Sequence, residues 1–310
     1  MKRIAVLLLL CLFLVGCTGN SQADRTFFAM DTVIQLQIWG RESDAGAEAV
    51  EQLLHQLEAQ WSATDPESTI GKLNRGLRIG LRPEELQVLD KARKLSERTG
   101  GCFDPMLYDV MKAWGFYDQN HRIPTQAELT QALSQERWDL GGVIKGYAGQ
   151  VAADLLLELD IDRAILNLGG NIQTVGEKPD GSPWQIGIQN PAGKGQVGIL
   201  SVYGTASIVT SGSYQRYFEE NGVRYHHIID PKTGYPMDSG LLSVTVICRD
   251  GMTADALSTA LFVMGLEQGT EFWRESDDFE AVFILTDGSI HATEGAALSG
   301  CEFEVIRRAK

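Results

Sequence analysis

The apolar run that most constrains this chain lies at its N-terminus, from Ile4 to Val15, and contains no charged residue. A helix needs ~20 consecutive apolar residues to cross a bilayer, so this run is too short to serve as a membrane span. The rest of the sequence offers no second candidate. We therefore expect a chain that folds as a globular domain and is not an integral membrane protein.

The residues around this run predict export. Two basic residues precede it, as in a secretory signal peptide. The segment ends in Gly16-Cys17, which resembles the lipobox of bacterial lipoproteins, where a cysteine is lipidated and becomes the new N-terminus. The resemblance implies a lipoprotein signal peptide over 1–16, and a lipidated Cys17 followed by a tether over 17–25. Acyl chains such as palmitate would then hold the protein on a bacterial membrane, facing the periplasm or the cell exterior. An ordinary secretory cleavage beside an accidental cysteine is the alternative.

The composition restricts both domain organisation and partners. Of the 310 residues, 44% are hydrophobic and 22% charged, so the chain can bury a full core. The formal net charge of -14 repels phosphate backbones, which makes nucleic acid an unsuitable partner. Since no Pro/Ser-rich linker divides the sequence, we expect a single mixed α+β domain over 26–310.

Local patterns predict helices and strands in mixed order. Helical spacing or end signals indicate helices over 45–61, 83–100, 145–159 and 253–264. Runs rich in β-branched and other apolar residues predict strands over 33–38, 164–168, 185–189, 207–210, 242–248 and 281–285. Asn221-Gly222 predicts a tight hairpin, because a type I′ turn needs two residues at positive φ.

The predicted helix over 253–264 carries a group of oxygen ligands. Asp255 and Thr259 are i, i+4 neighbours, with Ser258 beside them. Hard oxygens of this kind suit Mg²⁺, which takes few protein ligands and keeps places for water and phosphate. A structural role is the alternative, in which Asp255 complements the helix dipole and Thr259 bonds back to the backbone. The residues alone leave both interpretations open.

Two further segments carry polar groups at turns. Asp139-Leu140-Gly141-Gly142 leads into a helix and offers backbone N–H groups to an anion, with Lys145 as an added positive charge. A purely structural strand-to-helix turn is equally compatible with this pattern. In the segment around 225–236, strand alternation places His226 and His227 on opposite faces, so that one can be structural while the other faces a site.

Together with these segments, several short blocks give the sequence a family resemblance. The blocks are Phe28-Ala29-Met30-Asp31-Thr32, Gly101-Cys102-Phe103-Asp104-Pro105, Trp114-Gly115-Phe116, Asn167-Leu168-Gly169-Gly170-Asn171 and Thr210-Ser211-Gly212-Ser213-Tyr214. In this order they resemble the ApbE family of FAD:protein FMN transferases, which attach FMN to redox-pump subunits and related electron carriers. The resemblance implies an ApbE-like, T-fold-like α+β domain with antiparallel-rich sheets, FAD as substrate and Mg²⁺ as cofactor.

The resemblance also implies roles for individual residues. It assigns the metal to Asp255, Thr259 and the backbone carbonyl of Gly142. It assigns FAD contacts to Met30, Thr64, Phe103, Asp104, Asp139, Lys145 and Ile229. The family often has a flavin-stacking Tyr where this chain has Thr64, so ring stacking is not expected there. His227 is the implied base for the acceptor hydroxyl, and Asp139 is the second choice.

The implied reaction is the transfer of FMN from FAD to a threonine or serine of a flavin-acceptor protein, with release of AMP. Two other classes of function remain open at this point. An FAD pyrophosphatase would use the same metal ligands and let water attack, and a non-catalytic lipoprotein would bind FAD and leave it intact.

Overall fold

The computed structural model describes residues 21–118 and 120–308. The helices are α1 (Ser43–Trp61), α2 (Thr69–Asn74), α3 (Pro83–Arg98), α4 (Tyr108–Ala113), α5 (Gln126–Leu133), α6 (Ile144–Glu158) and α7 (Gly251–Arg274). The first strands are β1 (Gln22–Ala29), β2 (Thr32–Trp39), β3 (Arg163–Leu168), β4 (Asn171–Val175), β5 (Trp184–Gln189), β6 (Gln196–Val202) and β7 (Ala206–Gly212). The remaining strands are β8 (Tyr217–Glu220), β9 (Val223–His226), β10 (Leu241–Cys248), β11 (Phe279–Leu285), β12 (Ile290–Thr293), β13 (Leu298–Ser299) and β14 (Glu304–Ile306).

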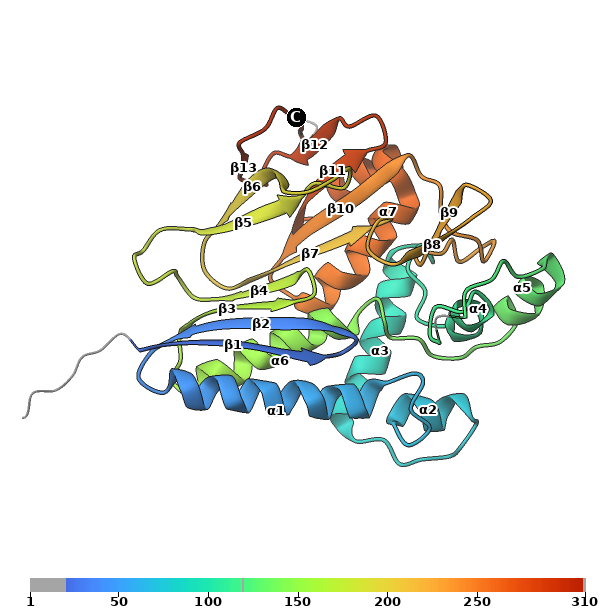
Figure 1. The fold of residues 1–310 in the computed structure, drawn as a ribbon, viewed down its shortest axis with the longest axis horizontal. Helices are drawn as coiled ribbons and strands as arrows, with labels where there is room; N and C mark the ends of the chain where they lie inside the picture. The colour runs from blue at the N-terminus through green and yellow to red at the C-terminus, as the bar shows by residue number, and fades with distance from the viewer. Residues whose placement is uncertain (1–20, 119, 309–310) are drawn as a thin grey trace, which may run out of the picture.

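A large sheet organises the described part of the chain (Figure 1). Its nine strands lie in the order β1-β2-β3-β4-β7-β10-β11-β12-β14. Neighbours pair antiparallel, apart from the parallel pair of β12 and β14. A smaller sheet has the order β13-β6-β5, and β8 and β9 form a separate hairpin. Helices and antiparallel-rich sheets in one domain confirm the α+β prediction.

The two faces of the large sheet have different surroundings. Alternate residues of β2, Ile34, Leu36 and Ile38, are almost fully buried and belong to the core that α1, α3 and α6 complete. Farther along the sheet, Val244 and Val246 of β10 pack with α7. Burial of each such side chain stabilises the fold by ~1.5–3 kcal/mol. On the opposite face, the smaller sheet covers β7, β11 and β12, whereas the outer face of β2 stays exposed.

A separate aromatic cluster lies beside one end of the sheet, where Figure 1 shows α4, α5 and the β8–β9 hairpin together. Its centre is Trp114, which is fully buried and donates a hydrogen bond from Nε1 to the carbonyl of Gly234 at 2.7 Å. The hairpin turn has φ of 51° at Asn221 and 78° at Gly222, which confirms the predicted turn. This cluster positions the segment that follows β9 against the strand ends.

The structure corrects one boundary and agrees with another. Strand β1 begins at Gln22, earlier than the expected domain start at residue 26, so residues 22–25, which were expected in the tether, belong to the large sheet. The sequence did not predict the start of this strand because β1 is an edge strand, and its alternate residues there are polar and exposed. The predicted helix end at Met264 agrees with the structure, because Gly265 has a non-helical backbone with φ 76° and ψ -178°, and a second helical stretch of α7 follows to Arg274. The expected signal peptide and Cys17 lie outside the described residues, and none of the described helices has the length and apolar character of a membrane span.

Candidate active site

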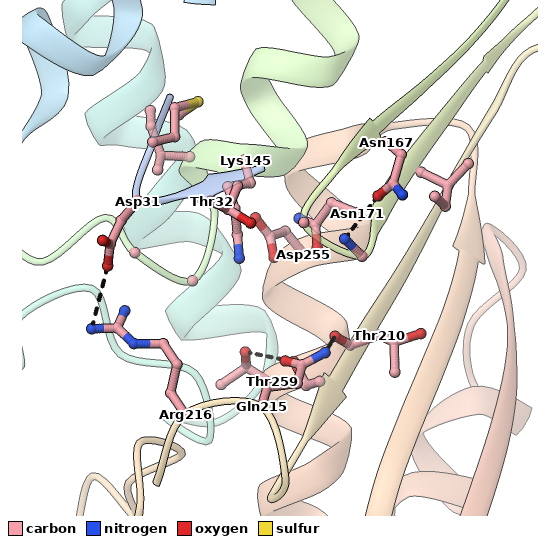
Figure 2. Close-up of a pocket in the computed structure, with 18 of the residues that line it drawn as sticks. Asp31, Thr32, Lys145, Asn167, Asn171, Thr210, Gln215, Arg216, Asp255 and Thr259 are labelled. Atoms are coloured by element: carbon pink, nitrogen blue, oxygen red, sulfur yellow. Dashed lines mark hydrogen bonds and ion pairs between the residues drawn. The ribbon is translucent and has the colours of Figure 1, made fainter. Parts of the chain in front are cut away.

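A pocket of about 1560 Å³ opens where several strands of the large sheet end (Figure 2). Its wall includes the β1–β2 and β3–β4 turns, the end of β7, the start of α6 and the middle of α7. Small-molecule pockets usually measure about 300–1,000 Å³, so this one has room for more than a single small ligand. The structure brings all the site residues named from the sequence to this one pocket: Met30, Thr64, Phe103, Asp104, Asp139, Gly142, Lys145, His227, Ile229, Asp255 and Thr259.

Close contact between α6 and α7 creates the centre of the pocket. A Cβ atom added at Gly146 would lie 2.0 Å from the carbonyl oxygen of Gly251, so only glycine permits this approach. The contact brings Asp255 to the first turn of α6, where its Oδ2 accepts a hydrogen bond from the backbone N–H of Gly146 at 2.9 Å. Two glycines from distant parts of the sequence thus place a carboxylate at a helix N-terminus.

Asp255 is a buried carboxylate with an exposed fraction of 5%. Burial raises its pKa above the ordinary value, while the charge of Lys145 and the Gly146 N–H oppose that rise. The helix cap is a different residue, because the side chain of Asp250 accepts from the N–H of Thr253 at 2.8 Å. The helix dipole acts mainly within the first turn, so capping does not explain Asp255. Asp255 therefore does not cap its own helix, and its hydrogen bond to Gly146 places it at the N-terminus of α6 instead.

The oxygen atoms around Asp255 fit a hard cation. Thr259 lies one turn later, and its Oγ1 is 3.3 Å from the hydroxyl of Ser211. The backbone of Gly142 lies nearby, since a Cβ added there would come 3.7 Å from Thr259 Oγ1. A carboxylate, a hydroxyl and a carbonyl form the kind of sparse ligand set that Mg²⁺ accepts. Ser258 is fully buried, and its hydroxyl forms a hydrogen bond with the hydroxyl of Ser211 at 2.8 Å. This bond joins α7 to β7.

The two histidines after β8 have different surroundings, as predicted. His226 is buried, its Nε2 lies 3.1 Å from the carbonyl oxygen of Met237 and its ring packs edge-on against Phe262, which is a structural role. His227 lines the pocket, and its Nδ1 lies 3.1 Å from the carbonyl oxygen of Arg216. That carbonyl can only accept, so Nδ1 carries the proton and Nε2 keeps a lone pair. Burial, followed by the charges of Arg216 and Lys145, lowers the pKa of His227 to about 3.

Comparison with known proteins identifies the family. The profile of the ApbE family matches residues 30–283. The chain belongs to the ApbE family. The FAD:protein FMN transferase of Treponema pallidum is 31% identical over 340 residues, covering 94% of this chain and 93% of that protein. The Klebsiella pneumoniae protein of the same name is 31% identical over 289 residues, covering 84% of this chain and 88% of that protein.

Solved structures of the ApbE family share the fold. The ApbE protein from Thermotoga maritima superimposes with a TM-score of 0.82 at 31% identity, covering 88% of this chain and 97% of that chain. The flavin transferase ApbE from Vibrio cholerae gives a TM-score of 0.79 at 27% identity, also covering 88% and 97%. The likeness to ApbE proteins therefore covers 88% of the chain and is not limited to the short sequence blocks.

The residues that the ApbE resemblance assigns to flavin line a second part of the pocket. Met30 lies in the β1–β2 turn with φ 54°, and its N–H donates to Glu58 at 2.9 Å. Phe103 and Ile229 are buried and present apolar surface. Burial raises the pKa of Asp104. Thr64 bonds to the hydroxyl of Ser62 at 3.1 Å, so a small polar group occupies the position where the family often has a ring.

The structure adds residues to which the sequence analysis assigned no role. Asn171 is buried beside Asp255, and its side-chain amide helps to lower the pKa of that carboxyl against the effect of burial. Arg216 forms an ion pair with Asp31 at 3.8 Å, which joins the β7–β8 loop to the β1–β2 turn (Figure 2). A lone Asn or an Arg in a loop carries no local pattern, so only the tertiary structure reveals these contacts.

Proposed function

We propose that this ApbE-family protein transfers FMN from FAD to a threonine or serine hydroxyl of another protein and releases AMP, in a reaction that requires Mg²⁺. The observation that carries the proposal is the single pocket. With a volume of about 1560 Å³ it has room for a dinucleotide, and it joins the buried Asp255 carboxylate and the Thr259 hydroxyl, which suit a cation, to the residues that the resemblance assigns to FAD. The relatives named FAD:protein FMN transferase, matched over most of the chain, support the same reaction.

Each residue has a task in this reaction. The acceptor hydroxyl oxygen attacks the phosphorus on the riboflavin side, and the bond to AMP breaks with its electron pair leaving on the AMP phosphate. Asp255, Thr259 and the Gly142 carbonyl would hold Mg²⁺, which when bound withdraws charge from the pyrophosphate. Lys145 and the N-terminus of α6 add positive charge beside it. The hydroxyl proton passes to Nε2 of His227, whose pKa rises when the anionic substrate binds nearby.

Mass spectrometry of an acceptor tests the proposed reaction. The soluble form lacking residues 1–17 is mixed with FAD, Mg²⁺ and a threonine-bearing flavin-acceptor domain. A mass gain equal to one esterified FMN, which is lost when the metal is chelated, supports the transferase. Free AMP and FMN with an unmodified acceptor would instead indicate an FAD pyrophosphatase, and intact FAD would indicate a carrier.

An Asp255→Asn variant tests the metal ligand. Loss of the carboxylate removes several kcal/mol of charge stabilisation, so we expect the rate of FMN transfer to fall about 100-fold or more. We also expect Mg²⁺ to raise the melting temperature of the parent protein and not that of the variant. Asp154→Asn, at an exposed position of α6, is the matched control. Transfer at the parent rate by Asp255→Asn would refute the assignment.

Export and anchoring belong to the same proposal and rest on the sequence. The protein would be exported and held on a bacterial membrane by a lipid on Cys17, so that the domain meets acceptor proteins at that surface. A Cys17→Ala variant should move from the membrane fraction to the soluble fraction and lose the acyl mass of its N-terminal peptide. Retention of the variant in the membrane fraction would contradict the anchor.

A further inference from the structure

The pocket extends beyond the flavin and metal residues onto the open face of the large sheet. Thr26 and Phe28 of β1, Gln35 and Gln37 of β2, and Asn167 of β3 line this extension. These residues alternate along their strands with the buried residues that face the helices. The floor of the extension is therefore the exposed face of β1, β2 and β3, which we call the sheet-face groove.

One wall of the sheet-face groove is the edge of a strand. Side chains of a strand alternate between two faces, yet all five consecutive residues from Gln185 to Gln189 of β5 line the pocket. Strand β5 therefore presents its edge to the groove. It pairs with β6 on one side and with no other strand in residues 21–118 and 120–308. Every second residue of such an edge has its N–H and C=O groups free to pair with another strand.

The chemistry of the groove suits a polypeptide. Three carboxamides line its floor, with Asn167 Nδ2 donating to Gln35 Oε1 at 3.3 Å and Gln37 beside them, next to the carboxylate of Asp24 and the apolar Ile165. Carboxamides both donate and accept, as peptide groups do. Phe28 and Val33 are directly paired across β1 and β2 and are 62% and 52% exposed, so they offer an apolar contact at the same place. Carboxamides and apolar side chains beside a free strand edge match an extended segment that offers peptide groups and apolar contacts.

The groove leads to the catalytic end of the pocket. Asn167 and Thr210 lie to the right of Asn171 and Asp255 in Figure 2, and all four residues line the pocket. The β3–β4 turn separates them, and its Gly170 N–H donates to Asn167 Oδ1 at 2.9 Å. Gln215 lies over this turn, with Nε2 bonded to the carbonyl of Thr210 at 3.1 Å. A chain lying in the groove would therefore reach the metal ligands by passing this turn.

We propose that the flavin-acceptor protein docks by adding an extended segment to the free edge of β5, so that its threonine reaches Asp255 and Thr259 past the β3–β4 turn. This inference rests on the proposed transfer reaction. Strand addition supplies affinity through main-chain hydrogen bonds, and the floor of the groove selects side chains. Strand β5 has six residues, so the segment spans ~20 Å. The occupant is a segment of the acceptor protein and not a second copy of this chain.

A Gln37→Trp variant tests the docking site, because a bulky ring would fill the groove toward the end of β2 that is remote from Met30. We expect the acceptor concentration for half-maximal transfer to rise about tenfold, with unchanged FAD affinity and unchanged acceptor-independent FAD cleavage. Val305→Trp, on the exposed strand β14 away from the pocket, is the matched control. Unchanged acceptor dependence in Gln37→Trp would overturn the proposal, whereas a parent protein that transfers no FMN would refute the proposed reaction itself.

Amide hydrogen exchange of the parent protein tests the strand addition directly. The probe is a flavin-acceptor domain whose target threonine is replaced by valine, added with FAD and Mg²⁺. We expect exchange to slow at alternate residues of β5, between Trp184 and Gln189. Exchange in β5 that does not change on addition of the probe would overturn the proposal. Protection of β5 that depends on protein concentration without the probe would also overturn it, because a second copy would then occupy the edge.

Discussion

At the scale of single residues, three side chains with oxygen atoms at and on helix α7 look equivalent in the sequence but have different roles in the structure. Asp250 caps the helix, Asp255 enters the pocket and Ser258 is buried behind it. Helical spacing correctly predicted that Asp255 and Thr259 share a face. It could not show which residue meets α6, because that contact joins residues far apart in the sequence. The interaction between Asp255 and Gly146 therefore had to come from the structure.

His227 gives a prediction for pH and stability. Its pKa is about 3 in the folded protein and about 6.5 in a solvent-exposed chain. Between these values the unfolded chain binds more protons at this residue, so the folded protein loses stability as the pH falls below about 6.5. We expect His227→Gln to reduce the slope of the unfolding free energy between about pH 6.5 and pH 4, measured by urea unfolding. His55→Gln, an exposed position of α1, is the control, and a slope equal to that of the parent would contradict the prediction.

At the scale of elements, the sequence predicted best those with a local signal. Helices α1, α3 and α6 follow from apolar spacing and end signals, and the β8–β9 hairpin follows from its turn. Strand β1 and the pairing of β5 with β6 depend on partners elsewhere in the chain. The candidate site was predictable through its sequence blocks, whereas the sheet-face groove was not, because no local pattern reveals which strand edge stays unpaired.

The contact between α6 and α7 gives a prediction at this scale. In Gly146→Ala the new Cβ would lie 2.0 Å from Gly251 O and 2.8 Å from Asp255 Cβ, so the two helices must separate. We expect a loss of about 1–3 kcal/mol in unfolding free energy and a loss of the Mg²⁺-dependent rise in melting temperature. In Gly80→Ala the added Cβ meets no atom within 4 Å, which makes it the control. A Gly146→Ala protein with the stability and Mg²⁺ response of the parent would contradict the close contact between α6 and α7.

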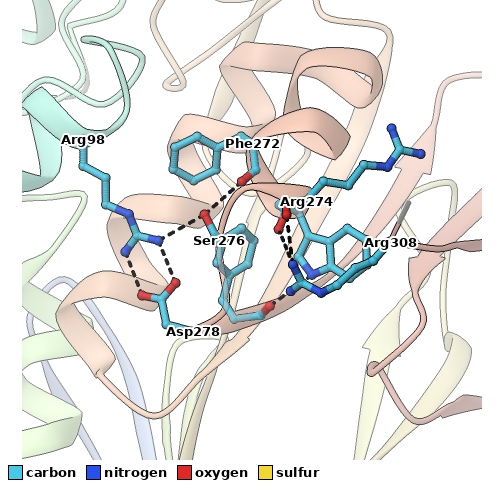
Figure 3. Close-up of polar contacts among 8 residues, drawn as sticks. Arg98, Phe272, Arg274, Ser276, Asp278 and Arg308 are labelled. Carbon is cyan, nitrogen blue, oxygen red and sulfur yellow. Dashed lines mark hydrogen bonds and ion pairs between the residues drawn. The ribbon is translucent and has the colours of Figure 1, made fainter. Parts of the chain in front are cut away.

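At the scale of the whole molecule, side-chain contacts join segments that are far apart in the sequence. Figure 3 shows Arg98, the last residue of α3, forming two hydrogen bonds with Asp278 at 2.7 and 2.6 Å, after the end of α7. Arg308 lies over the ring of Trp273 at 4.4 Å and donates to its carbonyl oxygen at 3.2 Å. These contacts join α3 and the C-terminal residues to α7, on which the proposed metal ligands Asp255 and Thr259 lie.

The ion pair of Arg98 and Asp278 gives a prediction of a small effect. Both side chains are partly exposed, at 32% and 42%, so water screens their attraction. We expect Arg98→Ala to lower the unfolding free energy by about 1 kcal/mol or less, and FMN transfer to remain at the parent rate. A double-mutant cycle with Asp278→Ala in urea unfolding measures the coupling. A loss of several kcal/mol, or a loss of transfer, would mean that the pair positions α7 as well as stabilising it.

The order of strands in the large sheet has a consequence for biosynthesis. From β1 at one edge to β14 at the other, the strands lie in the order in which the ribosome makes them. Each new strand can therefore join a neighbour that is already in place. Asp255 and Thr259 lie on α7, which follows β10 in the sequence and is therefore synthesised after it. Six of the nine strands precede α7 in the sequence, so a chain that ends before α7 can pair these strands but lacks the proposed cation ligands and should not transfer FMN.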